Sequence, residues 1–261
     1  MMLTGLADWI RLAGLRCEEA AGWQTRGHGE VRDDKQNIVV VDHHTAGSPL
    51  GRAGSLSTCL YGVPGVPGPL ANVLQTREPD GNDVFIVIAA GVSYNAGSGG
   101  FAGVSGNRST VGIECEHTGV VTYPAHRASL TQRFNAAVLK GLGHPDGSRS
   151  CQHSEWSTAG KIDIATGVDR DAWRAATTQF MRGGPLPAPD QEDEMQRDWF
   201  ATSPWDPTQL QVWWFTQAGH CYVPPSSWTV IQTDAALNGK PVPKPYKGTP
   251  EMFNQSPLIS A

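Results

Sequence analysis

One short polar segment of the 261-residue sequence, "CQHSEWSTAGKID" at residues 151–163, contains a histidine, a lysine and an aspartate. His153, Lys161 and Asp163 are too widely spaced for one helical turn, and the Ala-Gly pair at 159–160 disfavours a continuous helix. Taken alone, these side chains have a simple interpretation as surface residues. An imidazole and a carboxylate on one loop are also two ligands of an incomplete metal site, which would need a further ligand from elsewhere.

Two adjacent histidines, His43 and His44, are candidates for that further ligand. They end the apolar run "IVVVDHH" at 38–44, which predicts a buried strand whose rigid end can hold a ligand in place. Either histidine, with His153 and Asp163, gives two imidazoles and one carboxylate. Three protein ligands with an open fourth position are typical of catalytic zinc sites, which lower the pKa of water to about 7 and hydrolyse amides or esters.

Hydrolysis at such a site also needs a proton acceptor and a positive charge for the developing oxyanion. The segment "TVGIECE" at 110–116 alternates apolar and polar residues, which is the period of a half-buried strand. Glu114 and Glu116 point the same way from this strand, so either could accept the proton, although a solvated strand face is our interpretation for Glu116. Lys161 could supply the positive charge.

Three motifs, "VVDHHTAG", "STVGIECEHTG" and "HSEWSTAGKIDIATG", together resemble the type 2 N-acetylmuramoyl-L-alanine amidases. This zinc family includes bacterial muropeptide amidases, phage endolysins and animal peptidoglycan recognition proteins. The resemblance spans roughly residues 36–182, with the motifs in the family's order. It implies that zinc is held by His43, His153 and Asp163, that Glu114 is the base, and that Lys161 stabilises the oxyanion.

The sequence departs from the family pattern at three places. Ile164 replaces the family's proline after the aspartate, which we expect to alter only the loop. Asn95, in "YNAG", and Asn72 stand where the family commonly has histidine. Both asparagines can form hydrogen bonds but cannot carry a proton as histidine does, so they are candidate substrate-binding residues that bear on substrate preference.

The resemblance implies an enzyme that cuts the amide between N-acetylmuramic acid and L-alanine in bacterial peptidoglycan, most like a phage endolysin that lyses its host. Two alternatives are a non-catalytic peptidoglycan-recognition module and a virion-associated structural protein that carries a lytic domain. Recognition modules of this kind typically lack a zinc ligand, whereas all three candidate ligands are present here.

Hydrophobic periodicity predicts the elements that must position these residues. Strands mixed with helices predict an α/β domain with a central mixed β-sheet flanked by helices. The expected helices are 3–22, 129–143 and 169–184, and the expected strands are 38–44, 84–90 and 110–116.

Composition divides the chain into four parts. They are an N-terminal helix and connector (1–35), the zinc amidase domain (36–184), a proline-rich and then acidic linker (185–194) and a C-terminal appendage (195–261). The appendage is expected to be small and weakly structured. Its aromatic side chains could stack on cell-wall sugars or form a small core, and they include five of the nine tryptophans, Trp199, Trp205, Trp213, Trp214 and Trp228.

Bulk properties exclude several classes of protein. A net charge of -5 and a pI near 5.9 give no basic surface for nucleic acid, and no apolar run is long enough to insert into a membrane. The first residues lack the apolar core of a signal peptide, so we expect a protein that is made in the cytoplasm and reaches the wall after release. We also expect a monomer. An odd number of scattered cysteines predicts buried thiols rather than a disulfide framework: Cys17, Cys59, Cys115, Cys151 and Cys221.

Overall fold

The protein is described by a computed structural model that divides into two compact units, Met1–Asp190 and Gln191–Ala261. All the candidate site residues of the sequence belong to the first unit. In that unit the described residues are 1–46, 53–78, 82–119, 123–164 and 168–184, and in the second they are 199–202, 212–216, 219–223 and 246–247.

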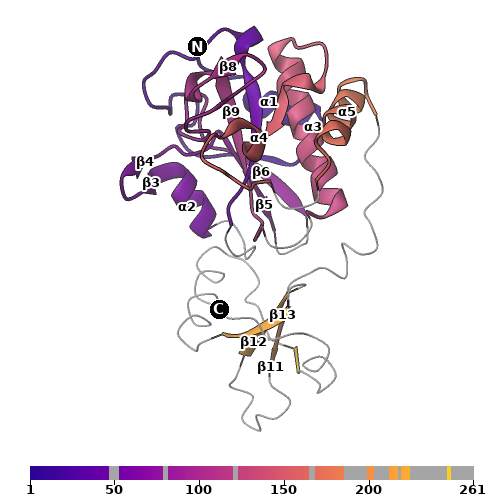
Figure 1. Cartoon of the computed structure of the whole chain (residues 1–261). Coiled ribbons are helices and arrows are strands. Elements are labelled where there is room, and N and C mark those ends of the chain that lie inside the picture. The colour runs from indigo at the N-terminus through magenta and orange to yellow at the C-terminus, as the bar shows by residue number, and fades with distance from the viewer. Residues whose placement is uncertain are drawn as a thin grey trace. The chain divides into compact units, whose positions relative to one another are not determined.

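A six-stranded sheet forms the centre of the first unit (Figure 1). Its strand order is β1-β6-β5-β9-β2-β10. Its strands are β1 (Cys17–Glu19), β2 (Val39–His44), β5 (Val73–Arg77), β6 (Asp83–Val87), β9 (Thr110–Cys115) and β10 (Ser150–Gln152). The pairing of β5 with β6 is antiparallel, and the other pairings of this sheet are parallel. Helices flank the sheet, so the predicted α/β fold with a mixed central sheet is confirmed.

The remaining elements among the described residues of the first unit are helices, short 3-10 turns and two small hairpins. The hairpins are β3 (Gly62–Val63) with β4 (Val66–Pro67), and β7 (Gly100–Phe101) with β8 (Val104–Ser105). The helices and turns are α1 (Leu6–Leu12), η1 (Lys35–Asn37), α2 (Ala53–Tyr61), η2 (Asn107–Ser109), α3 (Ala125–Leu142), η3 (Gly147–Arg149), α4 (His153–Trp156) and α5 (Arg170–Met181). Within the part of the chain that the structure describes, none of these helices combines the length and apolarity that crossing a bilayer requires.

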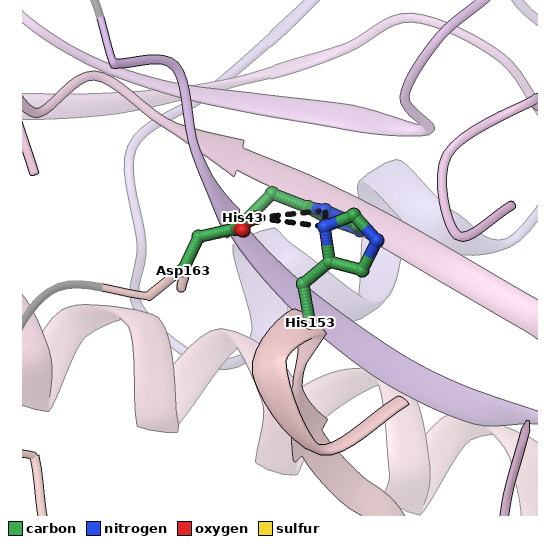
Figure 2. Close-up of side chains that lie close together, drawn as sticks. All are labelled: His43, His153 and Asp163. Carbon is green, nitrogen blue, oxygen red and sulfur yellow. Dashed lines mark hydrogen bonds and ion pairs between the residues drawn. The ribbon is translucent and has the colours of Figure 1, made fainter. Parts of the chain in front are cut away.

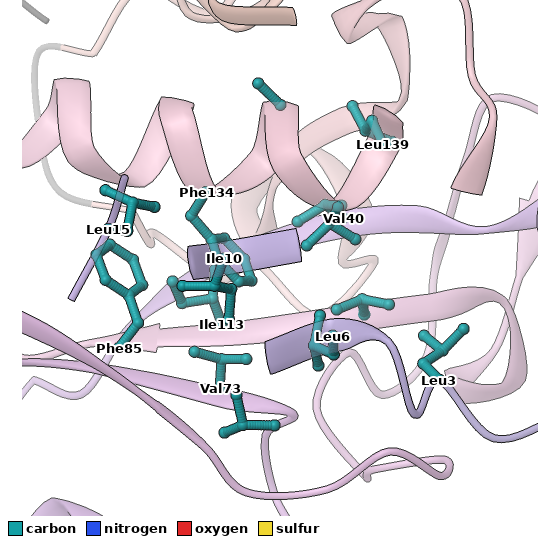
Figure 3. Close-up of a cluster of buried hydrophobic side chains, with 14 of the residues drawn as sticks. Leu3, Leu6, Ile10, Leu15, Val40, Val73, Phe85, Ile113, Phe134 and Leu139 are labelled. Carbon is teal, nitrogen blue, oxygen red and sulfur yellow. The ribbon is translucent and has the colours of Figure 1, made fainter. Parts of the chain in front are cut away.

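The main hydrophobic core lies between one face of the sheet and the helices α1, α3 and α5. Figure 3 shows Ile10 of α1 and Phe134 of α3 packed against Val40 and Ile113 of the sheet. Burial of one such side chain stabilises the fold by about 1.5–3 kcal/mol. This packing holds α3 against the sheet. The helix ends before Gly143, which adopts the left-handed conformation that commonly ends a helix.

Alternation along β2 separates the two faces of the sheet. Val40 contributes to the main core, whereas Val39 and Val41 pack in a second cluster with Cys151 and Trp156 on the other face. A strand buried on both faces explains the continuous apolar run in the sequence. Two residues after Val41, the same periodicity turns the side chain of His43 toward the second face.

The N-terminal segment differs from its prediction. The helix expected over 3–22 ends at Leu12, because Gly14 has a φ of 73° that stops it. The chain then forms β1, which pairs with β6 at the edge of the sheet. Leu6 and Ile10 are 0% exposed within the main core, so this segment is part of the first unit.

The second unit contains a four-stranded sheet with the order β13-β12-β11-β14. Three tryptophans lie on its strands, whereas Trp205, Trp228 and the predicted linker 185–194 lie outside the described residues. Wall binding by this unit stays a prediction. The strands are β11 (Trp199–Thr202), β12 (Val212–Thr216), β13 (Gly219–Val223) and β14 (Tyr246–Lys247).

Candidate metal centre

Three candidate ligands from distant parts of the sequence converge at one end of the sheet (Figure 2). His43 is near the end of β2, and His153 is the first residue of α4, directly after β10. Because β10 pairs with β2, with Gln152 opposite Asp42, the strand pairing brings the two imidazoles together. Asp163 follows on an irregular segment, whose main-chain oxygen at this residue accepts a hydrogen bond from the backbone N–H of Ser154 at 2.7 Å.

The polar atoms of this cluster are very close. Nδ1 of His43 lies 2.9 Å from Nδ1 of His153, and Oδ2 of Asp163 lies 3.4 Å and 2.8 Å from the same two nitrogens. The three residues are 1%, 7% and 8% exposed. Each of these atoms can offer a lone pair, and a cation bound among them would satisfy all three. Two imidazole nitrogens and one carboxylate oxygen are a donor set that suits zinc, so the residues fit the predicted metal.

Charge and burial prepare these side chains to act as ligands. Burial lowers the pKa of His43, and this effect exceeds the opposing influence of the Asp163 carboxylate. Burial alone would raise the pKa of Asp163, but the adjacent imidazoles of His153 and His43 hold it well below its usual value. A neutral imidazole beside an ionised carboxylate is the protonation state that metal binding requires.

The cluster lies in a pocket of about 580 Å³, which is also lined by Glu114 and Lys161. Glu114 is opposite His43 in the parallel pairing of β9 with β2, so both side chains lie on the same face. Its Oε2 atom is buried without a hydrogen-bond partner. Burial raises the pKa of Glu114 to about 8; the charge of Asp163 acts in the same direction and that of Lys161 opposes it. The lysine side chain itself is exposed.

The structure distinguishes the two adjacent histidines. His43 belongs to the three-ligand cluster, whereas His44 lines the pocket outside it. The His44 ring lies 6.2 Å from that of His117, centroid to centroid, and its Nε2 packs against Gly119, where a Cβ atom would lie only 2.5 Å away. His44 therefore packs between the end of the sheet and the loop after β9.

The two candidate substrate-binding asparagines have different environments. Asn95 lines the pocket. Asn72 is 0% exposed, and its amide donates to the carbonyls of Ala89 and Gly91. Its Oδ1 accepts from the hydroxyl of Ser93 and from the backbone N–H of residue 112. All four hydrogen-bonding positions of Asn72 are used inside the protein, so of the two asparagines only Asn95 can act from the pocket wall.

Glu116 does not lie on a solvated strand face, and that interpretation is wrong. The residue follows the last residue of β9 and is 0% exposed. Thr76 donates a hydrogen bond to its carboxylate, and Arg127 donates to its main-chain oxygen at 2.5 Å. Burial raises the pKa of Glu116. Its side chain therefore belongs to the protein interior, in contrast to Glu114 in the pocket.

An apolar rim of the pocket was missed from the sequence. Val63 and Val66 of the β3–β4 hairpin line it and are 46% and 41% exposed, and Ile162, which also lines the pocket, is 71% exposed. The signal was the repeated "GVPGVPG", in which valines alternate with turn residues. Exposed valines between turn residues indicate a surface that a ligand can cover.

Comparison with solved structures gives several similar folds. The structure is similar to that of an N-acetylmuramyl-L-alanine amidase. That protein is AmiD from E. coli, solved with the substrate anhydro-N-acetylmuramic acid-L-Ala-D-gamma-Glu-L-Lys. The two sequences are 15% identical, the match covers 72% of this chain and 75% of AmiD, and the TM-score is 0.43. An AmpD derivative matches at 21% identity, over 62% of this chain and 93% of its own, with a TM-score of 0.44.

A third similar structure is the Ph2119 endolysin from the Thermus scotoductus MAT2119 bacteriophage Ph2119, at 16% identity and a TM-score of 0.42, covering 65% of this chain and 100% of the endolysin. No protein-family model matches the chain, and no curated protein matches it. Because the identities and TM-scores are this low, a functional conclusion has to come from the side chains of this chain.

Proposed function

We propose that this protein is a zinc-dependent N-acetylmuramoyl-L-alanine amidase, which hydrolyses the amide between the lactyl group of N-acetylmuramic acid and L-alanine in peptidoglycan. The observation that carries the proposal is one pocket that contains the cluster of His43, His153 and Asp163 together with Glu114 and Lys161. These are the five positions that the motif resemblance implies. The sequence and the geometry thus support the proposal independently.

The metal would be held by His43, His153 and Asp163, which offer two neutral nitrogen donors and one anionic oxygen donor. When bound, zinc supplies Lewis-acid chemistry: it polarises a carbonyl group and lowers the pKa of water. The protein contributes a buried site whose ligand side chains are already gathered, and this limits the reorganisation needed on binding.

Glu114 and Lys161 have complementary tasks in the hydrolysis. Glu114 takes the proton of the attacking water on its carboxylate and then transfers it to the nitrogen of the departing L-alanine. Its raised pKa, caused by burial, makes the carboxylate a stronger proton acceptor than an exposed glutamate. Lys161 places a positive charge at the pocket wall, where it offsets the negative charge that develops on the carbonyl oxygen.

The biological role that we propose is that of a phage endolysin, which is made in the host cytoplasm and acts on the wall after release. The second unit would hold the enzyme to the wall. A chain ending at Gly184 should then cleave soluble muropeptide at close to the full rate, but sediment less with intact walls. Unfolding of the shortened chain, or unchanged sedimentation, would remove wall binding from the proposal.

Mass spectrometry of digested peptidoglycan tests the activity. The expected products are stem peptides with a free amino group on L-alanine and glycan strands with a free lactyl carboxyl group. Chelation and the His153→Ala substitution should both abolish these products. Added zinc should restore them in the chelated wild-type protein but not in the variant. Cleavage within the glycan or between stem-peptide residues would contradict the proposal, as would full activity of metal-free protein.

A further inference from the structure

The amide group of Asn95 has an orientation that its neighbours determine. Its Nδ2 lies 3.1 Å from the carbonyl oxygen of Ser93 and 3.0 Å from the hydroxyl oxygens of Ser93 and Thr110. Both hydroxyl protons are donated elsewhere, to Oδ1 of Asn72 and to the carbonyl oxygen of Asn107. All three neighbours therefore act as acceptors, and the NH₂ group of Asn95 must face them.

This orientation leaves Oδ1 of Asn95 on the opposite side, where it is buried without a hydrogen-bond partner. Nε2 of His43 is also buried without a partner, while Nδ1 of the same ring faces the other two candidate ligands. The two side chains lie close together: Asn95 packs over Gly112 of β9, which is opposite Val41 of β2, two residues before His43, and both side chains line the same pocket. One acceptor and one potential donor are thus buried side by side.

A glycine on the sheet makes room for Asn95. Gly112 lies on β9, opposite Val41 of β2 and two residues before Glu114. A Cβ atom at position 112 would lie 2.5 Å from both Cβ and Cγ of Asn95, much closer than atoms in contact allow. Glycine inside a strand is usually unfavourable, and such close approach of another group is one reason for its presence. The sheet therefore carries a slot for this carboxamide beside His43.

We propose that Asn95 is a positioning residue for His43, whose Nε2–H donates a hydrogen bond to Oδ1 of Asn95. A neutral imidazole carries one proton, so fixing it on Nε2 leaves the lone pair on Nδ1, the atom that faces His153 and Asp163. Asn95 thereby selects the tautomer that can bind a metal. This inference rests on the proposed zinc site and adds a residue that acts through a ligand.

Two substitutions test this role. Asn95→Ala removes the acceptor, and Gly112→Ala displaces the carboxamide from its slot without deleting it. Either change should weaken zinc binding by about 10–100-fold, as is typical when the partner of a metal-ligating histidine is lost. Zinc affinity is measured by competition with a chromophoric chelator. Asn107→Ala is the matched control, because Asn107 holds the same loop through the backbone N–H groups of Ala96 and Gly97.

The tautomer of His43 gives a readout that a general loss of stability would not produce. In metal-free protein with ¹⁵N-labelled histidine, the nitrogen chemical shifts should show His43 protonated at Nε2, with the signal assigned by comparison with His43→Gln. Asn95→Ala should give a mixture of tautomers, whereas Asn107→Ala should keep the wild-type shifts. Since this measurement uses no metal, it judges the role of Asn95 even if the wild-type protein binds no zinc, a result that would overturn the proposed function instead.

The proposal fails if wild-type His43 is protonated at Nδ1, or if Asn95→Ala keeps both the wild-type tautomer and zinc affinity within about twofold. Equal weakening of zinc binding by Asn107→Ala and Asn95→Ala would assign the effect to the loop and would also overturn it. If Asn95→Ala fails to fold, Gly112→Ala decides the question by the same two measurements.

Discussion

Asp42 and His43 are neighbours on β2, but their side chains belong to two very different buried polar groups on opposite faces of the sheet. Oδ2 of Asp42, which is 0% exposed, accepts hydrogen bonds from Nδ2 of Asn135 at 2.8 Å and Nε1 of Trp173 at 2.9 Å. Asn135 also donates to the hydroxyl of Ser150, so this group joins α3 and α5 to β2 and β10.

The difference between the two groups lies in which atoms meet. Around Asp42, one carboxylate oxygen meets two uncharged donors, while its Oδ1 and the Oδ1 of Asn135 are buried without a hydrogen-bond partner. Around His43, two imidazole nitrogens and the carboxylate oxygen of Asp163 lie within 3.4 Å of one another, and each of these atoms can offer a lone pair to a cation. One strand thus supplies stability on one face and a place for a cation on the other.

The largest expected effect is that of His153→Ala, which should abolish both zinc binding and amidase activity because only two ligands would be left. Metal content by atomic spectroscopy and turnover on muropeptide are the two measurements. Stability of the metal-free protein should fall only modestly, because Asp163, the main partner of His153, lines the pocket, where water can replace the lost hydrogen bond. A strong loss of metal-free stability would make this group structural, like that of Asp42.

Glu114→Gln and Lys161→Ala should each lower turnover by roughly 10²–10³-fold while zinc stays bound. The first removes the proton acceptor, and the second removes the positive charge that stabilises the oxyanion. Steady-state kinetics on zinc-loaded protein measure the effect. Glu116→Gln is the matched control, since that side chain is buried away from the pocket. If Glu116→Gln lowered the turnover of folded protein as much, the assignment of the base would be wrong.

Asp42→Ala should have the opposite profile, with lower stability but zinc still bound. It leaves the indole N–H of Trp173 and one amide hydrogen of Asn135 without an acceptor, at about 1–3 kcal/mol for each buried donor. Denaturant unfolding of metal-free protein measures this loss. Loss of zinc from the folded variant, with unchanged stability, would remove the proposed distinction between the two faces.

The smallest effect is expected for His44→Ala. Its ring packs near His117 and Gly119 outside the ligand cluster, so zinc content should stay at one ion per chain and only local packing should suffer. His43→Ala is the comparison and should lose the metal. Equal zinc loss in both variants, each still folded, would leave the choice of His43 over His44 unsupported.

The parts of the fold that the sequence predicted are those with strong periodicity. The apolar run that became β2, and the alternation of Val111, Ile113 and Cys115 that turns Glu114 to the other face, are both found in the structure, although β9 is buried on both faces rather than half-buried. These two strands carry much of the candidate site. The pairing that joins His43 to His153 was not derivable from periodicity, because β10 has only three residues.

Other elements were not predicted, because buried polar residues interrupt their hydrophobic pattern in the sequence. β5 was missed because Gln75 and Thr76, both 0% exposed, interrupt its apolar pattern. The hydroxyl groups of Thr131 and Tyr123 donate to Oε1 of Gln75, contacts between distant segments that no local pattern reveals. Glu116 was misjudged for the same reason, since its partner Thr76 belongs to the missed strand. Sequence periodicity cannot report polar groups that are satisfied by tertiary contacts.

The position of His153 directly after β10 has a consequence for local unfolding. β10 is a three-residue strand at the edge of the sheet, so its detachment from β2 is an easy way for the site to come apart. An ion that bridges His43 and His153 would oppose this detachment, by a free energy that grows with the logarithm of its concentration. Amide hydrogens of residues 150–152 should then exchange slowly with zinc and faster after chelation, while those of the central strands β5 and β9 exchange alike in both states. The bound metal would hold β10 against β2, so the lifetime of the closed site would depend on the zinc concentration.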